Sequence, residues 1–385
     1  MNNTRRKFLQ STGLVATLAS MGVGSSILSA CSGTKSRNDH LNILCWEGYN
    51  SERVLGPFRA KNLGAKVRAE SGTNDPDMIN KLRAGETNVW DLINVNQPWA
   101  RAQLFPSNLI KTLDKDRFLK YYDLMMDEFK GPYPYAFDQS GKELIGMVQR
   151  FGPFSFVVNT DKVSRKTAED QGFKLFLDPK MKGKYAILTY DDWNIIHLAL
   201  AADLDPSKEF SEDDFKKFKL VSDQIFKNAK LLSDDMTKLN QALVNNEISA
   251  YFTGGTYTAS PARIEGHKQI RAITPAKGPV DGKGGVVWVE VTSLVNNPNP
   301  STLAADFLEY VQQPEISKVV AFAEGTHNPV AQMGNPEVLK QFLPDELDAL
   351  QWDSLKEEMA RSIDYPIVPS HDKLIEIITA AKRTG

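Results

Sequence analysis

The sequence has few cysteines and no excess of either charge. Only Cys31 and Cys45 occur among its 385 residues, and its formal charge is −2 at pH 7. A chain so close to neutral lacks the basic surface that nucleic acids attract, which excludes nucleic acid as a partner. Hydrophobic residues make up 41% of the chain and charged residues 24%, as in an ordinary soluble globular protein. These proportions exclude a collagen, a coiled coil and a disordered tail protein.

The motifs of the common enzyme classes are also missing. The five histidines show no spacing typical of metal ligands, and there is no His-Glu-x-x-His motif. The sequence contains no Gly-x-Ser-x-Gly nucleophile turn, no phosphate-binding Walker loop and no Gly-x-Gly-x-x-Gly turn. We therefore predict no catalytic residues, no metal and no cofactor. An exported hydrolase, or a lipoprotein that acts only through protein contacts, is kept as the least favoured of the functional hypotheses.

One long stretch without any charged residue lies near the N-terminus, at residues 11–30. It follows the basic pair Arg5 and Arg6 and is diluted by glycine, serine and threonine. A basic start, a weakly apolar middle and a small-residue end predict a signal peptide at residues 1–30, and the paired arginines resemble a twin-arginine export signal. The end of this stretch resembles a bacterial lipobox, in which Cys31 becomes the lipidated N-terminus.

This leader has consequences for the rest of the chain. With Cys31 lipidated, Cys45 is the remaining thiol, so no intrachain disulfide is expected. Residues 31–40 are largely polar and lack apolar periodicity, which predicts a flexible tether. The alternative reading of residues 11–30 is an uncleaved membrane anchor, but the segment is too rich in glycine and hydroxyl residues for a good spanning helix.

From residue 41 onward, short apolar runs alternate with amphipathic stretches, which predicts alternating strands and helices. Ser51 is expected to cap one helix, and Asp75 to cap another that has Pro76 in its first turn. The predicted strands are residues 41–46, 65–69, 89–95, 184–189, 248–252 and 285–295. The predicted helices are residues 51–58, 75–82, 191–202, 215–226, 236–244, 302–311, 315–322 and 373–381.

These elements form two successive α/β groups with no linker rich in proline, glycine or serine between them. Because 385 residues are more than one core usually holds, we predict an α/β fold of two lobes. Each lobe is expected to be a mixed sheet flanked by helices, and hinge strands join the two. Ligands of open α/β sheets bind beyond the carboxyl ends of the strands, so we expect a site between the lobes.

Several segments, in order along the chain, resemble bacterial periplasmic spermidine/putrescine-binding proteins. The first, Leu41-Asn-Ile-Leu-Cys-Trp-Glu-Gly-Tyr49, is similar to the opening strand and turn of that family. The other segments are Trp90–Ile93, Phe156–Lys162, Leu188–Asn194, Tyr251–Tyr257, Trp288–Glu290 and Ala304–Glu315. Together they span nearly all of residues 41–381.

The resemblance implies a two-lobed periplasmic binding protein that delivers a polyamine, such as putrescine or spermidine, to an ABC importer. It implies that residues 41–150 and 289–335 form lobe one, and that residues 156–285 and 340–385 form lobe two. Together with the leader, it implies a periplasmic monomer held at a membrane by a lipid on Cys31. The implied partners are a small cationic amine and an ABC permease in the inner membrane.

In that family, aromatic walls bury the methylene groups of the amine and attract its charges, while carboxylates accept hydrogen bonds from its ammonium groups. Matching the segments position by position implies an aromatic wall, a set of acids and several small polar contacts. The candidate ligand-binding residues are Trp46, Glu47, Tyr49, Asn96, Asp191, Asn194, Phe252, Gly255, Trp288 and Glu290.

This chain departs from the family at two of these positions. Asn194 stands where the family usually has a second acid, and Gly255 stands where some members have aspartate or serine. The missing acid leaves open a mono-cationic or zwitterionic amine, such as an ω-amino acid, as the alternative ligand. Such a ligand needs a basic group or backbone N–H groups for its carboxylate. Arg150 inside the cleft would favour it, whereas a third carboxylate there would favour a polyamine.

Some candidates also have a purely structural explanation. Asp191 begins a predicted helix, where an acid is favourable without any ligand. Trp46 and Phe252 stand at strand ends and can simply pack in the core. Trp288 and Glu290 alternate along one predicted strand and therefore share a face. Because an acid in an apolar strand is hard to explain as core, we expect this pair to contact the ligand.

Overall fold

The computed structural model describes residues 37–72, 74–325 and 327–383. The predicted signal peptide, residues 1–30, and the predicted lipidation site Cys31 lie outside these ranges. Within them, none of the helices combines the length and the apolar character needed to cross a bilayer.

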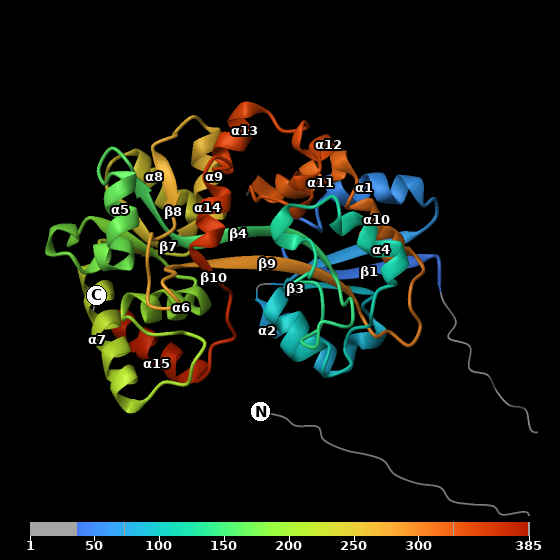
Figure 1. The fold of residues 1–385 in the computed structure, drawn as a ribbon, viewed down its shortest axis with the longest axis horizontal. Helices are drawn as coiled ribbons and strands as arrows, with labels where there is room; N and C mark the ends of the chain where they lie inside the picture. Colours follow the sequence, from blue (N-terminus) through green and yellow to red (C-terminus); the bar gives the residue numbers. More distant parts are fainter. Residues whose placement is uncertain (1–36, 73, 326, 384–385) are drawn as a thin grey trace, which may run out of the picture. The chain divides into compact units, whose positions relative to one another are not determined.

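The described strands join in one 10-stranded mixed sheet, in the order β2-β1-β3-β9-β4-β7-β5-β6, with β10 beside β9 and β8 beside β4. Their bounds are β1 His40–Cys45, β2 Lys66–Ser71, β3 Leu92–Asn96, β4 Met147–Asn159, β5 Tyr185–Leu188, β6 Leu231–Ser233, β7 Ala250–Gly255, β8 Ile270–Ile273, β9 Gly285–Leu294 and β10 Ser362–Asp364. Figure 1 shows the long strands β4 and β9 running between a group that includes β7 and β8 and a group that includes β1 and β3.

Strand direction changes at these two long strands. β1 pairs in parallel with β2 and β3, and β5 pairs in parallel with β6 and β7. β9 is antiparallel to β3 and β4, and β4 is antiparallel to β7 and β8. All 13 residues of β4 are buried, and its mainly apolar sequence also places the polar residues Gln149, Arg150, Ser155 and Asn159 in the interior. The pairing of β4 with β9 shifts register between Val148 and Phe151, so the strands are irregular where one group gives way to the other.

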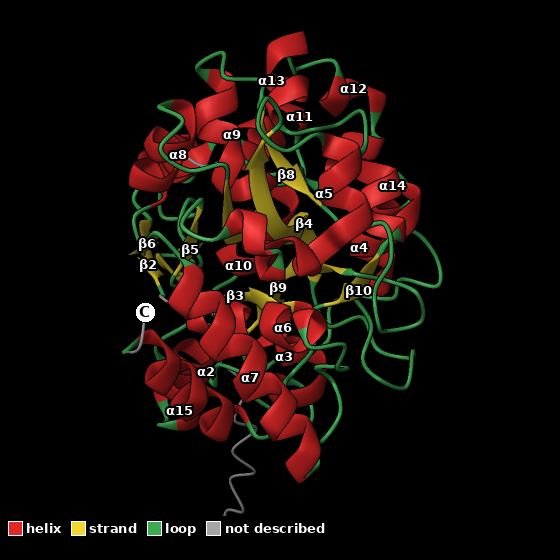
Figure 2. Cartoon of the chain, turned by 90° about the vertical axis from the view of Figure 1, so that its left-hand side faces the viewer, coloured by secondary structure: helices red, strands yellow, loops and turns green. Residues whose placement is uncertain are grey.

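Helices cover the strands on several sides (Figure 2). Their bounds are α1 Glu52–Lys61, α2 Asp75–Arg83, α3 Gln97–Trp99, α4 Lys115–Tyr122, α5 Arg165–Gln171, α6 Asp191–Ala201, α7 Glu212–Asn228, α8 Met236–Val244, α9 Thr256–Ile264, α10 Leu303–Tyr310, α11 Pro314–Ala321, α12 Pro336–Leu339, α13 Pro344–Ala349, α14 Leu355–Ala360 and α15 His371–Lys382. The predicted α/β fold, with a mixed sheet flanked by helices, is confirmed.

The caps of two helices test the local reading of the sequence. Ser51 caps α1 as predicted, and its hydroxyl accepts a hydrogen bond from the Arg53 N–H. At α2 the prediction is wrong by one residue, because the cap is Asn74, whose side chain accepts from the Asp77 N–H. Asp75 is therefore the first residue of the helix and its carboxylate is not used as a cap.

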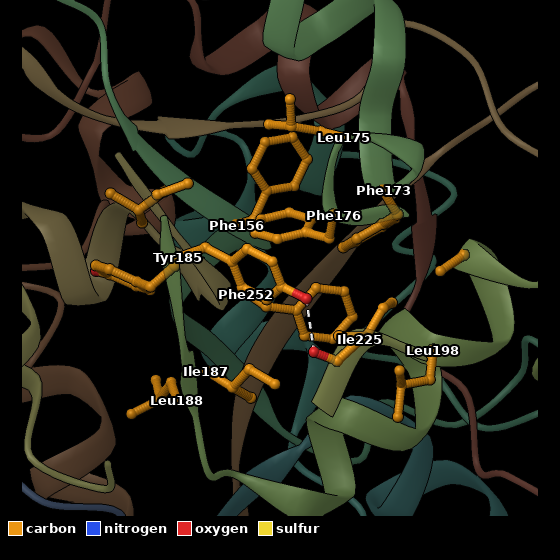
Figure 3. Close-up of a cluster of buried hydrophobic side chains, with 14 of the residues drawn as sticks. Phe156, Phe173, Leu175, Phe176, Tyr185, Ile187, Leu188, Leu198, Ile225 and Phe252 are labelled. Atoms are coloured by element: carbon orange, nitrogen blue, oxygen red, sulfur yellow. Dashed lines mark hydrogen bonds between the residues drawn. The ribbon is translucent and has the colours of Figure 1, made fainter. Parts of the chain in front are cut away.

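Large apolar clusters lie on the two groups of strands. Around β5 and β7, the rings of Phe173 and Phe176 pack against Phe252 at centroid distances of 5.6 and 5.1 Å (Figure 3). In the same cluster the Tyr185 hydroxyl donates to the Ile225 carbonyl at 2.6 Å. A second cluster gathers side chains of β1, α1, α10 and α11. The exact boundaries of the two lobes stay a prediction.

The described end of the predicted tether is bound to the sheet region. Arg37 donates through Nη2 to both carboxylate oxygens of Asp91, at 2.7 and 2.9 Å, and the Asp91 side chain is buried. The Arg37 N–H also donates to the Pro300 carbonyl. Residues 37–40 are therefore held by the fold, and β1 begins within the segment assigned to the tether.

Candidate ligand-binding cavity

A cavity of about 530 Å³ lies at the carboxyl ends of both sets of parallel strands. Its lining residues follow β1, β2 and β3 in one group, and β5 and β7 in the other. The sequence predicts a site in this position, and the volume is typical of sites for small molecules. The lining residues are Trp46, Glu47, Ser71, Gly72, Asn74, Asp75, Pro76, Asn96, Arg150, Phe154, Tyr190, Asp191, Asp192, Trp193, Tyr257, Trp288, Glu290, Asn328 and Tyr365.

Three polar lining residues from neighbouring strands stand side by side. Asn96 of β3 and Glu290 of β9 are direct partners across the antiparallel pair, and Arg150 of β4 contacts Glu290 from the other side. We call Asn96, Glu290 and Arg150 the polar row. It crosses β3, β9 and β4 where the two groups of strands meet.

Glu290 is already bound by Arg150. Its oxygens accept hydrogen bonds from Nε and Nη2 of Arg150 at 3.0 and 2.8 Å, and Oε2 also accepts from the Tyr49 hydroxyl at 2.9 Å. Burial acts to lower the pKa of Arg150, but the combined effects of Glu290, Tyr49 and Glu47 outweigh burial and raise that pKa, so the guanidinium stays protonated. Burial raises the pKa of Glu290 against the effect of Arg150. The two-point contact favours the ion pair over two neutral groups.

The acids at the start of α6 are paired as well. Lys382, the last residue of α15, donates to both oxygens of Asp191 at 2.6 and 2.7 Å. Asp192 contacts Nε2 of His371 at 2.8 Å, and this contact raises the pKa of the histidine. Both acids lie at the cavity, but each already has a basic partner.

Asp75 is a buried acid of a different kind. Its Oδ1 accepts hydrogen bonds from the indole N–H of Trp46 at 3.0 Å and the backbone N–H of Asn96 at 3.2 Å. Its Oδ2 accepts one from the Asn96 side chain at 2.8 Å. Only 3% of the residue is exposed, and burial raises the pKa of Asp75 to about 7, although these three hydrogen bonds oppose the rise.

Glu47 joins the two sides of the cavity. Its Oε1 accepts a hydrogen bond from the Tyr257 hydroxyl at 2.6 Å. Glu47 follows β1, whereas Tyr257 lies in the first turn of α9, just after β7. Within the described residues, Glu47 and Asp75 are the lining acids that form no ion pair with a lysine, arginine or histidine.

Aromatic side chains form much of the remaining wall. The ring of Trp193 lies between Phe154 and Tyr365, at centroid distances of 4.5 and 4.7 Å. Such surfaces bury methylene groups and attract cations at their faces. The aromatic lining residues are Trp46, Phe154, Tyr190, Trp193, Tyr257, Trp288 and Tyr365.

Two lining amides have polar atoms without partners. Asn328 is 1% exposed, and neither its Oδ1 nor its Nδ2 has a hydrogen-bond partner among the described residues. Asn96 is 6% exposed and, on the same basis, its Oδ1 has none. Buried polar atoms without partners are uncommon in folded proteins. Both amides line the cavity, so a polar ligand can satisfy them there.

The structure brings six of the predicted ligand-binding residues to the cavity: Trp46, Glu47, Asn96, Asp191, Trp288 and Glu290. The other four do not line it: Tyr49, Asn194, Phe252 and Gly255. Tyr49 is 2% exposed and lies behind Glu290, to which its hydroxyl donates, so it supports the polar row from outside the cavity.

The remaining three residues lie outside the cavity for local reasons. Asn194 is fully buried, donates to the Leu188 carbonyl at 3.0 Å and accepts from the Thr253 hydroxyl at 2.6 Å. Phe252 belongs to the aromatic cluster of Figure 3, because β7 is paired on both sides. A Cβ at Gly255 would come within 2.4 Å of the Pro153 carbonyl oxygen, so glycine is needed there for close strand packing.

Several lining residues that the fold brings to the cavity were not predicted from the sequence. Asp75 has a recognisable signal, an acid beside Pro76 at a helix start, but this pattern predicts a helix cap and not a cavity residue. Arg150 lies within the apolar segment of β4, and no local pattern links it to Glu290, 140 residues away. The other lining residues that were not predicted are Ser71, Gly72, Asn74, Pro76, Phe154, Tyr190, Asp192, Trp193, Tyr257, Asn328 and Tyr365.

Solved structures share this fold across nearly the whole described chain. A putative spermidine/putrescine ABC transporter protein from Listeria monocytogenes matches 90% of this chain and 99% of its own, with a TM-score of 0.67 and 14% identity. The spermidine/putrescine ABC transporter substrate-binding protein PotD from Streptococcus pneumoniae covers the same shares, with a TM-score of 0.65 and 15% identity. The binding protein MotA from A. tumefaciens, in complex with glucopine, also covers these shares, with a TM-score of 0.59 and 14% identity.

These likenesses confirm the predicted two-lobed binding-protein fold and the resemblance to the spermidine/putrescine type. Among curated proteins, none matches this sequence. A model of the family described as bacterial extracellular solute-binding protein matches residues 108–358, more than half of the chain. The chain therefore belongs to the bacterial extracellular solute-binding proteins, which capture ligands for ABC importers.

Proposed function

We propose that this protein captures a protonated amine, such as putrescine or spermidine, in the cavity at the polar row. One observation carries the proposal: the described lining holds five carboxylates and one guanidinium among aromatic walls. A polyamine is an alkyl chain with protonated nitrogens at intervals. Aromatic faces attract each cation by about 0.5–2 kcal/mol, and a hydrogen bond to a carboxylate contributes about 1.5–3 kcal/mol.

The charges that line the cavity bear on the choice between a polyamine and a zwitterionic amine. Arg150 lies at the cavity, which favours a zwitterionic ligand, but more than three carboxylates lie there too. The charge of Arg150 is balanced by Glu290, whereas Glu47 and Asp75 have no basic partner within the described residues. The excess of negative charge therefore supports a cationic ligand.

We further propose that the protein is exported, held at a membrane by a lipid on Cys31, and delivers its ligand as a monomer to an inner-membrane ABC permease. Support comes from the twin-arginine-like start and the lipobox-like end of the leader. The family is one of transport proteins and not of enzymes.

A zwitterionic amine, such as an ω-amino acid, is the second candidate ligand. It is favoured by Nη1 of Arg150, which donates to no described residue, and by the unpartnered Nδ2 of Asn328. Both are N–H donors at the cavity and suit a carboxylate. The relative MotA, solved with glucopine, has the same fold.

Titration calorimetry of the purified protein with putrescine, spermidine and 4-aminobutanoate separates the two ligands. Tight binding of a polyamine with weak binding of 4-aminobutanoate supports the first proposal, and the reverse order supports the second. Binding of none of the three at millimolar concentration would overturn both.

A further inference from the structure

We infer that Asp75, together with the side-chain oxygen of Asn96, forms the main binding position for an ammonium group of the ligand. This inference rests on the proposed function and deepens it. The family resemblance points instead to Asp191 and Glu290 as the acids that take the amine. In this chain Asp75, at the end of the cavity near β2 and β3, binds the ammonium group instead.

The geometry at Asp75 suits a cation. Three N–H groups, from Trp46 and Asn96, fix the carboxylate at the cavity and leave one lone pair on Oδ2 for a further donor. The Asn96 side chain donates through Nδ2 to Asp75, so its Oδ1 remains an acceptor, and it is buried without a partner within the described residues. One –NH₃⁺ group has three N–H bonds to share between these neighbouring acceptors.

The other acids are less available. A ligand cation at Glu290 has to compete with the two-point contact from Arg150. A cation at Asp191 has to compete with Lys382, which contacts both oxygens. The Arg150–Glu290 pair is buried, so separating its partners leaves one charge uncompensated, which is costly. The Lys382–Asp191 pair is partly exposed, and there the ligand competes with the contact of Lys382 to both oxygens. At Asp75 an arriving ammonium displaces no protein cation.

The groups around Asp75 also affect whether its carboxylate is protonated. Trp46, which follows β1, and Asn96 of β3 face the carboxylate and carry no charge. Glu290 of β9 acts on it as a negative charge that is balanced by Arg150 of β4. Tyr365 lies close enough for Asp75 to raise its pKa. On its own helix, Asp77 is exposed.

Burial, with a smaller contribution from Glu290, raises the pKa of Asp75 to about 7. At neutral pH the empty site therefore carries a proton part of the time. An ammonium group requires the carboxylate form, so ligand capture releases the proton into water. Affinity should rise as the pH rises towards 7 and level off above it.

Calorimetry with putrescine tests this in the wild-type protein. At pH 7, titrations in phosphate and in Tris should show release of about 0.5 proton per ligand bound, since a group with a pKa near 7 is half protonated. Below about pH 6 the affinity should fall by up to about tenfold for each pH unit. Binding without proton release and with a flat profile from pH 5.5 to 8 would overturn the inference.

Variants assign the released proton to its residue. D75N should bind putrescine about tenfold or more weakly at pH 8, because a charged acceptor becomes neutral, and its pH profile should be flat. D77N removes the same charge from the same helical turn and should keep the wild-type affinity and profile. H371Q, which removes the histidine beside Asp192, should keep the proton release. Release that persists in D75N or disappears in H371Q contradicts the assignment.

The outcomes distinguish a failure of the proposed function from a failure of the inference about Asp75. Wild-type protein that binds neither a polyamine nor 4-aminobutanoate overturns the proposed function and this inference with it. Wild-type protein that binds putrescine without proton release, and is matched by D75N, overturns the inference alone. If D75N does not fold, the wild-type proton release decides the question.

Discussion

Arg150 of β4 and Glu290 of β9 form a two-point ion pair inside the protein, 140 residues apart in sequence, at the place where the two groups of strands meet. Tyr49 adds a third hydrogen bond to the carboxylate, and its ring lies 4.7 Å from the guanidinium carbon. Two neighbouring strands are thus joined by side chains where their backbone pairing is irregular.

Removal of one partner of this pair should destabilise the protein strongly. R150M leaves the Glu290 carboxylate buried without its cation, and we expect a loss of about 3–5 kcal/mol in the free energy of unfolding. R117M breaks an ion pair with Glu309 at the surface and should cost at most about 1 kcal/mol. Urea denaturation of both variants measures the difference. Equal losses of unfolding free energy in R150M and R117M would mean that the buried Arg150–Glu290 pair contributes no more to stability than a surface ion pair.

Trp288 should contribute to ligand affinity through its aromatic face. It lines the cavity, whereas Trp352 packs against the core cluster around β1 and α1. A cation–aromatic contact contributes about 0.5–2 kcal/mol, so W288L should bind putrescine about 2- to 30-fold more weakly. W352L should bind as the wild type does. Calorimetry at pH 8 compares the two, and a similar loss in both argues against an aromatic wall at Trp288.

The contact between Tyr257 and Glu47 should slow the release of ligand. Y257F removes the hydroxyl that donates to Glu47 across the cavity. A neutral donor to a charged acceptor is worth about 1.5–3 kcal/mol, which predicts dissociation about tenfold or more faster. Stopped-flow tryptophan fluorescence measures this rate. Y121F removes a similar hydroxyl–carboxylate contact, with Glu309, away from the cavity, and a dissociation rate as fast as that of Y257F would refute the prediction.

Asp75 should make the stability of the empty protein depend on pH. Its pKa is raised from an ordinary value of 3.8 to about 7, so the folded chain keeps a proton that the unfolded chain loses. The stability from this proton is fully present below the ordinary value and is lost as the pH rises through about 7. D75N lacks the effect and should gain stability relative to the wild type by up to about 1.4 kcal/mol per pH unit between pH 5 and 7. Denaturation of both proteins without ligand at pH 5, 6, 7 and 8 measures the difference in their free energies of unfolding. A difference that stays constant over this pH range would contradict the prediction.

The local pattern of the sequence predicts most elements that lie around the cavity. Residues 236–244 form a helix as expected, and the strand predicted at residues 285–295 is β9, one residue shorter. Apolar periodicity and helix caps act over a few residues, so they identify elements well. The alternation of side chains along a strand likewise places Trp288 and Glu290 on one face of β9, and both line the cavity.

What the sequence could not provide is the partner of each charged group. Glu290 is at the cavity as predicted, but its pairing with Arg150 depends on the register between β4 and β9. Asp191 is paired by Lys382 from the last helix, 191 residues away. Phe252 is buried because β7 lies in the interior of the sheet, and strand order is not visible in a local pattern. The sequence can thus indicate which residues lie near the cavity, but not which of them remain free to bind a ligand.

The ion pair between Arg37 and Asp91 affects how a pulling force on the N-terminal end of the described chain is transmitted to the sheet. Asp91 also accepts hydrogen bonds from the backbone N–H groups of Asn42 and Ser301, so a single buried carboxylate ties the incoming chain to three other segments. A pull on the chain ahead of Arg37 is first resisted by this junction and by the bond to the Pro300 carbonyl, before the force reaches the ladder between β1 and its neighbours. This junction therefore helps to keep Trp46 and Glu47, just beyond β1, in register with the other residues that line the cavity.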